Sequence, residues 1–215
     1  MSAWPGFFIS LEGIDGAGKS TLAAALGGEL SRSGHDVVIV RPADTQLGEL
    51  VRGYLLQHHQ VPVDPWTEAL LFNAGRVQLL RERILPALKT GAVVIADRYA
   101  DSTFAYQGGG RGLPMAGLHW LHSEACHDVW PDLTFLLELP RGVAEERQRS
   151  QQLPLDRFET AADRFHAAVQ AAFDELARAD PARIVRIDAA RPPATVFAEI
   201  REIAVHRLAR HAGAA

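Results

Sequence analysis

One stretch of eight residues constrains the fold of this chain more than any other. Residues 13–20 read GIDGAGKS and match the pattern G-x-x-x-x-G-K-[ST] at every fixed position. In this pattern the glycines let the backbone turn so that successive N–H groups face a phosphate, with a helix N-terminus behind them. Such a loop needs a strand before it and a helix after it. The motif therefore predicts an α/β protein that binds a phosphate.

The rest of the chain supplies the alternation that this loop requires. Short, continuous apolar runs predict buried strands over residues 7–11, 36–41, 92–97, 132–139 and 183–188. Longer periodic segments predict helices over residues 20–33, 66–88, 115–129, 160–178 and 195–210. Strands that alternate with helices form βαβ units, so we expect a three-layer α/β fold with a parallel sheet and helices on both faces.

The composition predicts an ordinary globular protein without a general affinity for polyanions. The chain has 215 residues, 47% of them hydrophobic and 22% charged, and a net charge of -4 at pH 7. We expect one domain over residues 1–215, with no nucleic-acid partner and no membrane association. The start has no basic n-region, and no run approaches the ~18 apolar residues of a membrane helix. The single cysteine, Cys126, cannot form a disulfide within the chain, so we expect a buried thiol in a reducing cytoplasm.

The phosphate-binding loop also predicts a metal ligand. Lys19 can reach the β- and γ-phosphates of a nucleotide, and the Ser20 hydroxyl can ligate Mg²⁺. We expect ATP to bind along the loop and the first helical turn, at Gly13, Asp15, Gly16, Ala17, Gly18, Lys19, Ser20 and Thr21. GTPase switches, motor ATPases and small kinases all carry such a loop. The guanine motif N-K-x-D is missing, because the only asparagine, Asn73, is followed by alanine.

A second informative stretch, DRYADSTFAYQGGGRGL, covers residues 97–113 and begins where a predicted strand ends. In a parallel sheet that strand end lies at the same edge as the phosphate-binding loop. Asp97 can hold Mg²⁺ through water, and Arg98 can fork onto a phosphate. Aromatic and neutral polar residues follow, which suit a nucleotide's sugar and base: Tyr99, Ser102, Thr103, Tyr106 and Gln107. The alternative is a surface ion pair followed by a glycine-rich loop.

Taken together, these segments resemble thymidylate kinases, the P-loop NTPase-fold kinases that phosphorylate dTMP. The matching segments, in the family's order, are EGIDGAGKST (12–21), LGELVR (47–52), LLFNAGR (70–76), DRYADSTFAYQGGGRGL (97–113), PDLTFLLELP (131–140) and LDRFE (155–159). The resemblance implies a core of five parallel strands, a homodimer, ATP with Mg²⁺ as donor, and dTMP as acceptor, in dTTP biosynthesis.

The resemblance also implies residue roles. Lys19 and Ser20 would serve ATP and Mg²⁺, and Asp15 would reach the 3′-hydroxyl of the acceptor. Phe72 would stack on thymine, and Arg76 would bond its carbonyl edge.

Four further matched residues would complete the acceptor site. Arg98 would hold the acceptor phosphate, and Ser102 and Gln107 would complete the base pocket. Tyr106 would pack on the deoxyribose, where it would crowd a 2′-hydroxyl.

The helix that carries Phe72 and Arg76 can be examined independently of the resemblance. At ~100° per residue, one apolar stripe predicts its core face: Leu70, Val77, Ile84 and Leu88. Phe72 and Arg76 are four residues apart and share a different face. Phe72 is therefore available for a ligand; the alternatives are a subunit contact or a helix that is buried all round.

One stretch departs from the family pattern. Family members typically read R-E-P-G-G-T after the second strand, and that arginine contacts the acceptor phosphate. Residues 40–45 here read VRPADT, so either Val40 or Arg41 takes the arginine's place. We retain Arg41 as a candidate substrate residue, although Asp44 adds a negative charge nearby.

Phosphoryl transfer needs cations, and the loop itself supplies few. The acceptor phosphate is already ionised at neutral pH, with a second pKa of roughly 6, so the reaction needs positioning and charge stabilisation rather than a general base. None of residues 14–17 is basic. We therefore expect the catalytic arginine in a mobile lid at about 141–157, which offers Arg147, Arg149 and Arg157. The alternative is a solvated, charged helix face.

Three other functions share parts of this pattern. A deoxynucleoside kinase, or a kinase for another pyrimidine monophosphate, would also carry the loop and the Asp-Arg pair. A nucleotide-dependent switch would hydrolyse ATP slowly, without an acceptor.

Overall fold

The computed structural model describes residues 4–57, 61–150, 157–158 and 161–213. All structural statements concern these residues.

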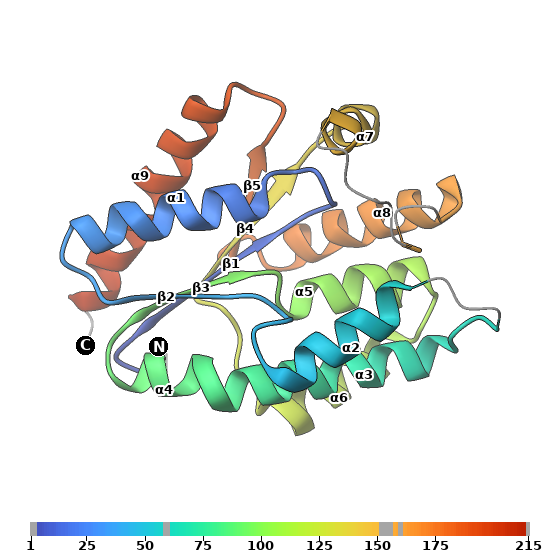
Figure 1. Cartoon of the computed structure of the whole chain (residues 1–215). Helices are drawn as coiled ribbons and strands as arrows, with labels where there is room; N and C mark the ends of the chain where they lie inside the picture. The colour runs from blue at the N-terminus through green and yellow to red at the C-terminus, as the bar shows by residue number, and fades with distance from the viewer. Residues whose placement is uncertain (1–3, 58–60, 151–156, 159–160, 214–215) are drawn as a thin grey trace.

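A five-stranded parallel sheet forms the centre of the molecule (Figure 1). The strands β1 (Phe7–Glu12), β2 (Val37–Val40), β3 (Val93–Asp97), β4 (Leu133–Glu138) and β5 (Ile184–Asp188) lie in the order β2-β3-β1-β4-β5. β1 is central and pairs in parallel with both β3 and β4. This confirms the five predicted strands, each within one residue of its expected ends.

Helices cover both faces of the sheet (Figure 1). One face carries α1 (Lys19–Arg32) and α9 (Pro193–Ala212); the other carries the remaining helices except the peripheral α7. These are α2 (Gln46–Leu56), α3 (Pro65–Leu79), the π-helical turn η1 (Leu80–Ile84), α4 (Leu85–Lys89), α5 (Ala100–Thr103), the π-helical turn η2 (Phe104–Gly110), α6 (Met115–Cys126) and α8 (Asp163–Ala179).

Alternation along β1 divides the core between the two faces. Phe7, Ile9 and Leu11 pack with α1 and α9, whereas Phe8 points to the opposite side and packs with η1 and β3. Successive side chains of a strand point to opposite faces, so a strand with helices on both sides is apolar throughout. All six residues of β1 are buried, including Glu12.

The predicted core stripe of the helix over 66–88 is wrong at Leu70, whereas Val77 is partly buried and packs against the core. Leu70 is 52% exposed, whereas Asn73 and Leu79 on α3 are buried. Ile84 and Leu88 are buried, as predicted. The cause is the π-helical turn η1, which adds a residue to one turn and shifts the helical phase between α3 and α4.

Within residues 97–113, residues 100–110 form helical turns rather than a glycine-rich loop. Here α5 runs directly into η2, and the glycines of η2 let it approach α8 closely. A Cβ atom at Gly109 would lie 2.5 Å from the Cβ of Ala172 on α8. The glycine run therefore serves helix packing.

The segment expected to form the lid begins with α7 (Arg141–Ser150). The Gln-Gln-Leu-Pro stretch expected to be its moving part, residues 151–154, lies outside the described residues. Cys126 is fully buried, as predicted.

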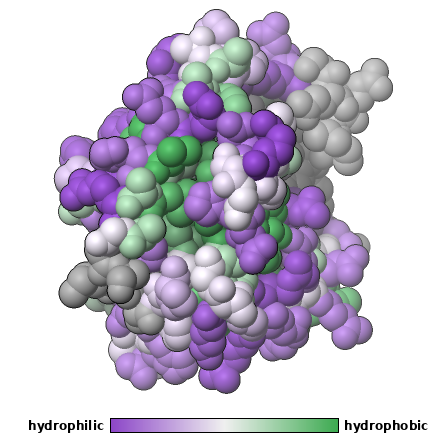
Figure 2. Space-filling model, turned by 90° about the vertical axis from the view of Figure 1, so that its left-hand side faces the viewer, coloured by the Kyte–Doolittle hydropathy of each residue, from purple (hydrophilic) through white to green (hydrophobic). Residues whose placement is uncertain are grey.

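The two ends of the sheet differ. Figure 2 faces the amino-terminal ends of the strands and shows hydrophobic side chains gathered in a hollow, with hydrophilic residues around them. The phosphate-binding loop lies at the opposite end, after β1. Within the described residues, we find no helix whose length and apolar character would let it cross a membrane.

Candidate active site

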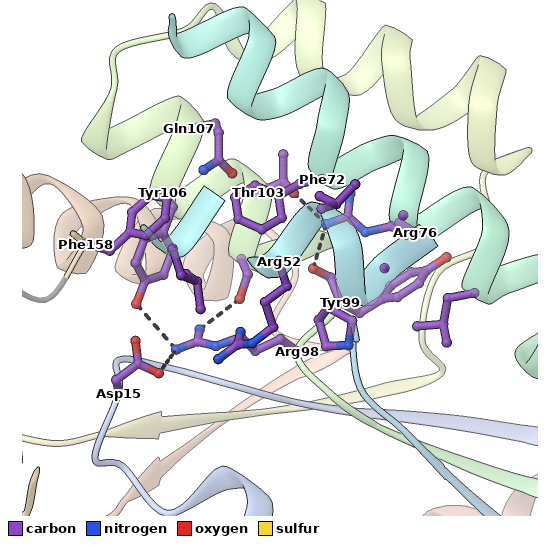
Figure 3. Close-up of a pocket in the computed structure, with 17 residues that line it drawn as sticks. Asp15, Arg52, Phe72, Arg76, Arg98, Tyr99, Thr103, Tyr106, Gln107 and Phe158 are labelled. Carbon is purple, nitrogen blue, oxygen red and sulfur yellow. Dashed lines mark hydrogen bonds and ion pairs between the residues drawn. The ribbon is translucent and has the colours of Figure 1, made fainter. Parts of the chain in front are cut away.

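A pocket opens beside the phosphate-binding loop, at the carboxyl ends of β1 and β3 (Figure 3). Side chains from α2, α3, α5 and η2 form its walls. The lining residues are Asp15, Pro42, Gly48, Val51, Arg52, Leu56, Phe72, Gly75, Arg76, Leu79, Arg98, Tyr99, Ser102, Thr103, Tyr106, Gln107 and Phe158.

The backbone of the phosphate-binding loop requires its glycines. Gly13, Gly16 and Gly18 have φ angles of 128°, 81° and 93°, which L side chains rarely adopt. A Cβ atom at Gly13 would lie 2.5 Å from the carbonyl oxygen of Leu137 on β4. The loop thus lies close against the sheet edge and leads into α1 at Lys19.

Lys19 folds back over this loop. Its Nζ donates a hydrogen bond to the carbonyl oxygen of Ile14 at 2.7 Å and lies 3.6 Å from Oδ1 of Asp15. Burial, together with the positive charge of Arg98, lowers the pKa of Lys19 to about 8, and Asp15 opposes this shift. An incoming polyphosphate would favour the charged form of Lys19.

Ser20 and Asp97 face one another across the loop. The Ser20 Oγ donates a hydrogen bond to Oδ2 of Asp97 at 2.5 Å. A hydroxyl and a carboxylate beside a phosphate-binding loop are the oxygen ligands that Mg²⁺ takes while it keeps several waters. This donor set fits a magnesium ion.

Arg98 is the centre of the polar site. It follows β3 directly and has a φ of 74°, an uncommon conformation for a non-glycine residue. Its guanidinium donates to Oδ1 of Asp15 at 2.6 Å and to the Ser102 hydroxyl at 3.0 Å. Burial disfavours the charged forms of Arg98 and Asp15, but the attraction between the two charges is stronger. This attraction raises the pKa of Arg98 well above its usual value and holds the pKa of Asp15 well below its usual value.

Glu12 supports Arg98 from behind. It ends β1, is fully buried, and accepts hydrogen bonds from the Tyr99 N–H at 2.6 Å and the Ser102 hydroxyl at 2.5 Å. Burial and the nearby Asp101 raise the pKa of Glu12 to about 7, although these hydrogen bonds and Arg98 favour its ionised form. Sequence reasoning missed Glu12; the available signal was an acidic residue at the end of a largely apolar strand.

Phe72 and Arg76 lie at the same wall of the pocket, on one face of α3 (Figure 3). The Arg76 guanidinium donates to the Asn73 side chain at 2.8 Å, to the Tyr99 carbonyl at 3.1 Å and to the Thr103 hydroxyl at 2.5 Å. These contacts fix its orientation.

Tyr106 and Gln107 line the pocket from η2. The Tyr106 hydroxyl lies 3.4 Å from the Arg98 guanidinium, whose centre is 5.3 Å from the tyrosine ring. Gln107 lies at the end of the pocket away from Arg98 and Asp15 (Figure 3). The pocket therefore has a loop end, where Asp15 and Arg98 meet, and an α3 end, which Phe72, Arg76 and Gln107 line.

Arg41 lies apart from this pocket. Its guanidinium is 63% exposed and is 3.4 Å from the Asp44 carboxylate, which also accepts the Arg41 N–H. Among the described residues, the loop after β2 lines the pocket through Pro42, and α2 adds Arg52. Sequence reasoning noted Arg52 only as a match in LGELVR and did not select it.

The lid arginines lie apart from one another. Arg147 donates to the Ala189 carbonyl at 3.1 Å, and the exposed Arg149 donates to the Glu145 carbonyl at 3.2 Å. Arg157 is 2.6 Å from Glu68. Arg141, which sequence reasoning did not select, lines a small cavity with Ile14 and Asp15.

Known proteins of one family are similar to this chain over most of its length. A family model described as thymidylate kinase matches residues 11–200. A thymidylate kinase of Cereibacter sphaeroides is 46% identical over 198 residues, 90% of this chain and 91% of that protein. A thymidylate kinase of Pseudomonas fluorescens strain SBW25 is 47% identical over 192 residues, 89% of this chain and 91% of that protein.

A solved structure is similar over nearly its whole length. The crystal structure of thymidylate kinase from Ehrlichia chaffeensis has a TM-score of 0.73 and 30% sequence identity, and the match covers 92% of this chain and 98% of that one. With the family model matched over most of the chain, these similarities show that this protein belongs to the thymidylate kinase family.

Proposed function

We propose that this protein phosphorylates dTMP to dTDP with ATP as the phosphoryl donor, a step in dTTP biosynthesis. Phosphorylation of dTMP is the function of the thymidylate kinase family. The observation that carries the assignment is the shared position of Asp15, which belongs to the phosphate-binding loop and also lines the neighbouring pocket. Donor and acceptor sites therefore adjoin.

Positioning and cationic charge account for the chemistry. The phosphate of dTMP is ionised at neutral pH and attacks without a general base. In our proposal Arg98 holds the acceptor phosphate, with Arg52 beside it, while Lys19 neutralises the donor. Support comes from the Arg98–Asp15 distance of 2.6 Å, which brings the two halves of the site together.

We assign the loop residues Gly13, Asp15, Gly16, Ala17, Gly18, Lys19, Ser20 and Thr21 to ATP. Ser20 and Asp97 would hold Mg²⁺, directly or through water, and this assignment is supported by their oxygen ligands and 2.5 Å separation. When bound, the ion would neutralise charge on the β- and γ-phosphates.

The α3 end of the pocket suits the nucleoside. Phe72 would stack on thymine, and Arg76 and Gln107 would contact its polar edge. Asp15 would reach the 3′-hydroxyl, and Tyr106 would pack on the deoxyribose and exclude a 2′-hydroxyl. Ser102, whose hydroxyl bonds to Arg98 and Glu12, would complete the base pocket.

The lid would supply the remaining cation. We propose a single catalytic domain over residues 1–215 whose lid covers about 141–157, with Arg147, Arg149 and Arg157 as candidates for transition-state charge. The position of Arg141 beside Ile14 and Asp15 adds a fourth candidate. Arg41 stays a weaker candidate for the acceptor phosphate, because Asp44 pairs with it.

We further propose that the protein acts as a homodimer in the cytoplasm. Large apolar side chains are exposed on three neighbouring helices: Leu47, Leu50 and Tyr54 on α2, Trp66 and Leu70 on α3, and Trp120 on α6. Large apolar side chains exposed on neighbouring helices suit a subunit interface. The buried single cysteine suits a reducing compartment.

A coupled ADP-release assay tests the function. The protein is supplied with Mg·ATP and, separately, dTMP, thymidine, other deoxynucleoside monophosphates or no acceptor. We expect rapid turnover with dTMP. Preferential turnover of thymidine would indicate a deoxynucleoside kinase, and slow hydrolysis that is independent of any acceptor would indicate a nucleotide switch.

A further inference from the structure

A buried carboxylate lies behind Gln107, at the α3 end of the pocket. Glu68, in the first turn of α3, is fully buried. Its Oε1 accepts hydrogen bonds from Nε2 of Gln107 at 2.7 Å and Nε of Arg111 at 3.2 Å, and its Oε2 accepts from Nη2 of Arg157 at 2.6 Å. Burial of a carboxylate is costly unless ion pairs and hydrogen bonds satisfy it. Here two guanidinium groups do so, and the neutral Gln107 is a third partner.

This arrangement determines which end of the Gln107 amide meets a ligand. An ionised carboxylate only accepts hydrogen bonds, so the amide must turn its NH₂ group toward Glu68. The amide oxygen, which cannot bond to Glu68, is then the acceptor that Gln107 offers to the pocket it lines. An unsupported glutamine could rotate and present either end.

Arg76 supplies the complementary group at the same end of the pocket. Its guanidinium is a donor in every orientation, and bonds to Asn73, Tyr99 and Thr103 fix it. A fixed donor from Arg76 and a fixed acceptor from Gln107 match a pyrimidine with a carbonyl at position 4 and a proton on N3. They mismatch a 4-amino pyrimidine, whose N3 is an acceptor and whose exocyclic group is a donor.

We propose that Glu68 is a positioning residue that sets the base preference of this kinase by locking the Gln107 amide with its oxygen toward the pocket. The inference rests on the proposed phosphorylation of dTMP and names how that site rejects 4-amino pyrimidines. Glu68 does not itself touch the substrate.

The same carboxylate connects base recognition to the C-terminal end of the lid. Arg157 also donates to the Leu55 carbonyl, and its guanidinium centre lies 4.4 Å from the ring of Phe158, which lines the pocket. A variant of Glu68 therefore disturbs Arg157 as well, so the test must separate the two effects.

The test compares dTMP with 5-methyl-dCMP, which differ only at position 4 and N3. Values of kcat/KM are measured for the wild type, Glu68→Gln, Gln107→Met and the double variant. An amide at position 68 can donate to the Gln107 oxygen and release the lock. The preference for dTMP is the ratio of kcat/KM with dTMP to kcat/KM with 5-methyl-dCMP. We expect Glu68→Gln to lower this ratio by roughly ten- to a hundredfold, the scale of one matched hydrogen-bond pair to a base edge.

Two variants keep the proposal falsifiable if Glu68→Gln folds poorly. Gln107→Met leaves both arginine pairs of Glu68 in place and should lose the same preference. Arg157→Met, the matched control, should change the rate but not the ratio between the two substrates. In the double variant, Glu68→Gln should have no further effect on the ratio, because its effect passes through Gln107.

The proposal would be overturned if Glu68→Gln lowered kcat/KM by the same factor with dTMP and with 5-methyl-dCMP. It would also be overturned if Gln107→Met left the ratio of the two kcat/KM values unchanged. A wild-type protein that does not phosphorylate dTMP would instead overturn the proposed function, so the two failures are distinguishable.

Discussion

At the scale of single residues, Arg98 carries two costs that its neighbours offset. Its φ of 74° is a strained conformation for a non-glycine residue, and such strain costs on the order of 1–3 kcal/mol. Its charge is also largely buried. Asp15 neutralises the charge, and Glu12 bonds to Tyr99 and Ser102 on the chain that follows. Strain of this kind persists where the surroundings hold it in place, as at active sites.

Glu12 predicts a pH dependence of stability. Burial raises its pKa from 4.5 to about 7, so the folded protein binds this proton more tightly than the unfolded chain. The stabilisation from the protonated group is complete below pH 4.5 and is lost as the pH rises toward 7, by at most about 1.4 kcal/mol per pH unit. Urea unfolding gives the free energy of unfolding of each protein at each pH. The wild-type value minus the Glu12→Gln value should fall as the pH rises across this window.

Glu124→Gln, an exposed substitution on α6, is the matched control and should give a difference that does not vary with pH. A pH-independent difference for Glu12→Gln as well would contradict the assigned shift.

Phe72 predicts a loss of acceptor affinity. Its ring lines the pocket from α3 and lies 6.1 Å from the ring of Phe158. Phe72→Ala should weaken dTMP binding by roughly 1–3 kcal/mol, the range for base–aromatic stacking in single-strand binders. Calorimetric titration measures this directly. Phe197→Ala on α9 removes the same side chain far from the pocket and should leave the affinity unchanged.

At the scale of elements, α2 contributes to the site through close backbone packing. Gly48 lies in its first turn, where a Cβ atom would collide with the carbonyl oxygen of Pro42. Both residues line the pocket. The start of α2 therefore needs a glycine for packing rather than for an unusual φ.

Two glycines of α2 predict opposite effects on stability. Gly48→Ala should destabilise the protein and weaken dTMP binding, because backbone atoms must move apart. Gly53→Ala, on the open side of the same helix, meets nothing within 4 Å and should stabilise by about 0.5–1 kcal/mol through helix propensity. Thermal unfolding of the two variants and of the wild type measures both changes in stability. If both are stabilised, the contact between Gly48 and Pro42 is not tight in solution.

The helix α7 predicts unequal roles for its two candidate arginines. Arg147 and Arg149 are two residues apart, so they point in different directions from the helix. We expect one of Arg147→Met and Arg149→Met to be nearly silent. The other should lower kcat by up to about 10³-fold with little change in ATP affinity, as for a contact that tightens in the transition state. Steady-state kinetics of both variants and the double variant measure this. A double variant within about tenfold of wild type would leave Arg157 and Arg141 as candidates.

At the scale of the whole molecule, α2 and α3 take part both in the pocket and in the group of helices with exposed apolar side chains. The helix α3 contacts both α2 and α6, and the three lie together on one side of the molecule (Figure 1). Trp66 lies against α6, where a Cβ atom on Gly117 would be 2.8 Å from its ring. Trp66 and Leu70 are four residues apart and share a helix face.

This surface predicts the effect of charge on assembly. Leu70→Glu or Trp120→Glu should convert the proposed dimer to a monomer, because an unpaired carboxylate in an apolar interface is costly. Sedimentation equilibrium gives the mass. Val205→Glu, on the exposed side of α9, is the control and should keep the wild-type mass. Unchanged mass in both test variants would place the interface elsewhere.

The sequence by itself determined the parts of this protein that depend on local patterns. The five apolar runs each predict a strand, although the edge strands β2 and β5 are only partly buried, and the GIDGAGKS loop fits only the junction between a strand and a helix. The i, i+4 spacing of Phe72 and Arg76 likewise predicts a shared face, and both line the pocket.

Only the tertiary structure decided which charged groups meet, because their partners are far apart in the chain. Glu68 pairs with Arg157, 89 residues away, and Glu12 with Ser102, 90 residues away. The exposure of Leu70 depends on a π-helical turn that no apolar period reveals. Arg52 lines the pocket and Arg41 does not, because Asp44 holds Arg41 outside. The spacing of neighbouring residues is enough to predict helices and strands. The position of a buried charge depends on its ion-pair and hydrogen-bond partners, which only the folded chain brings together.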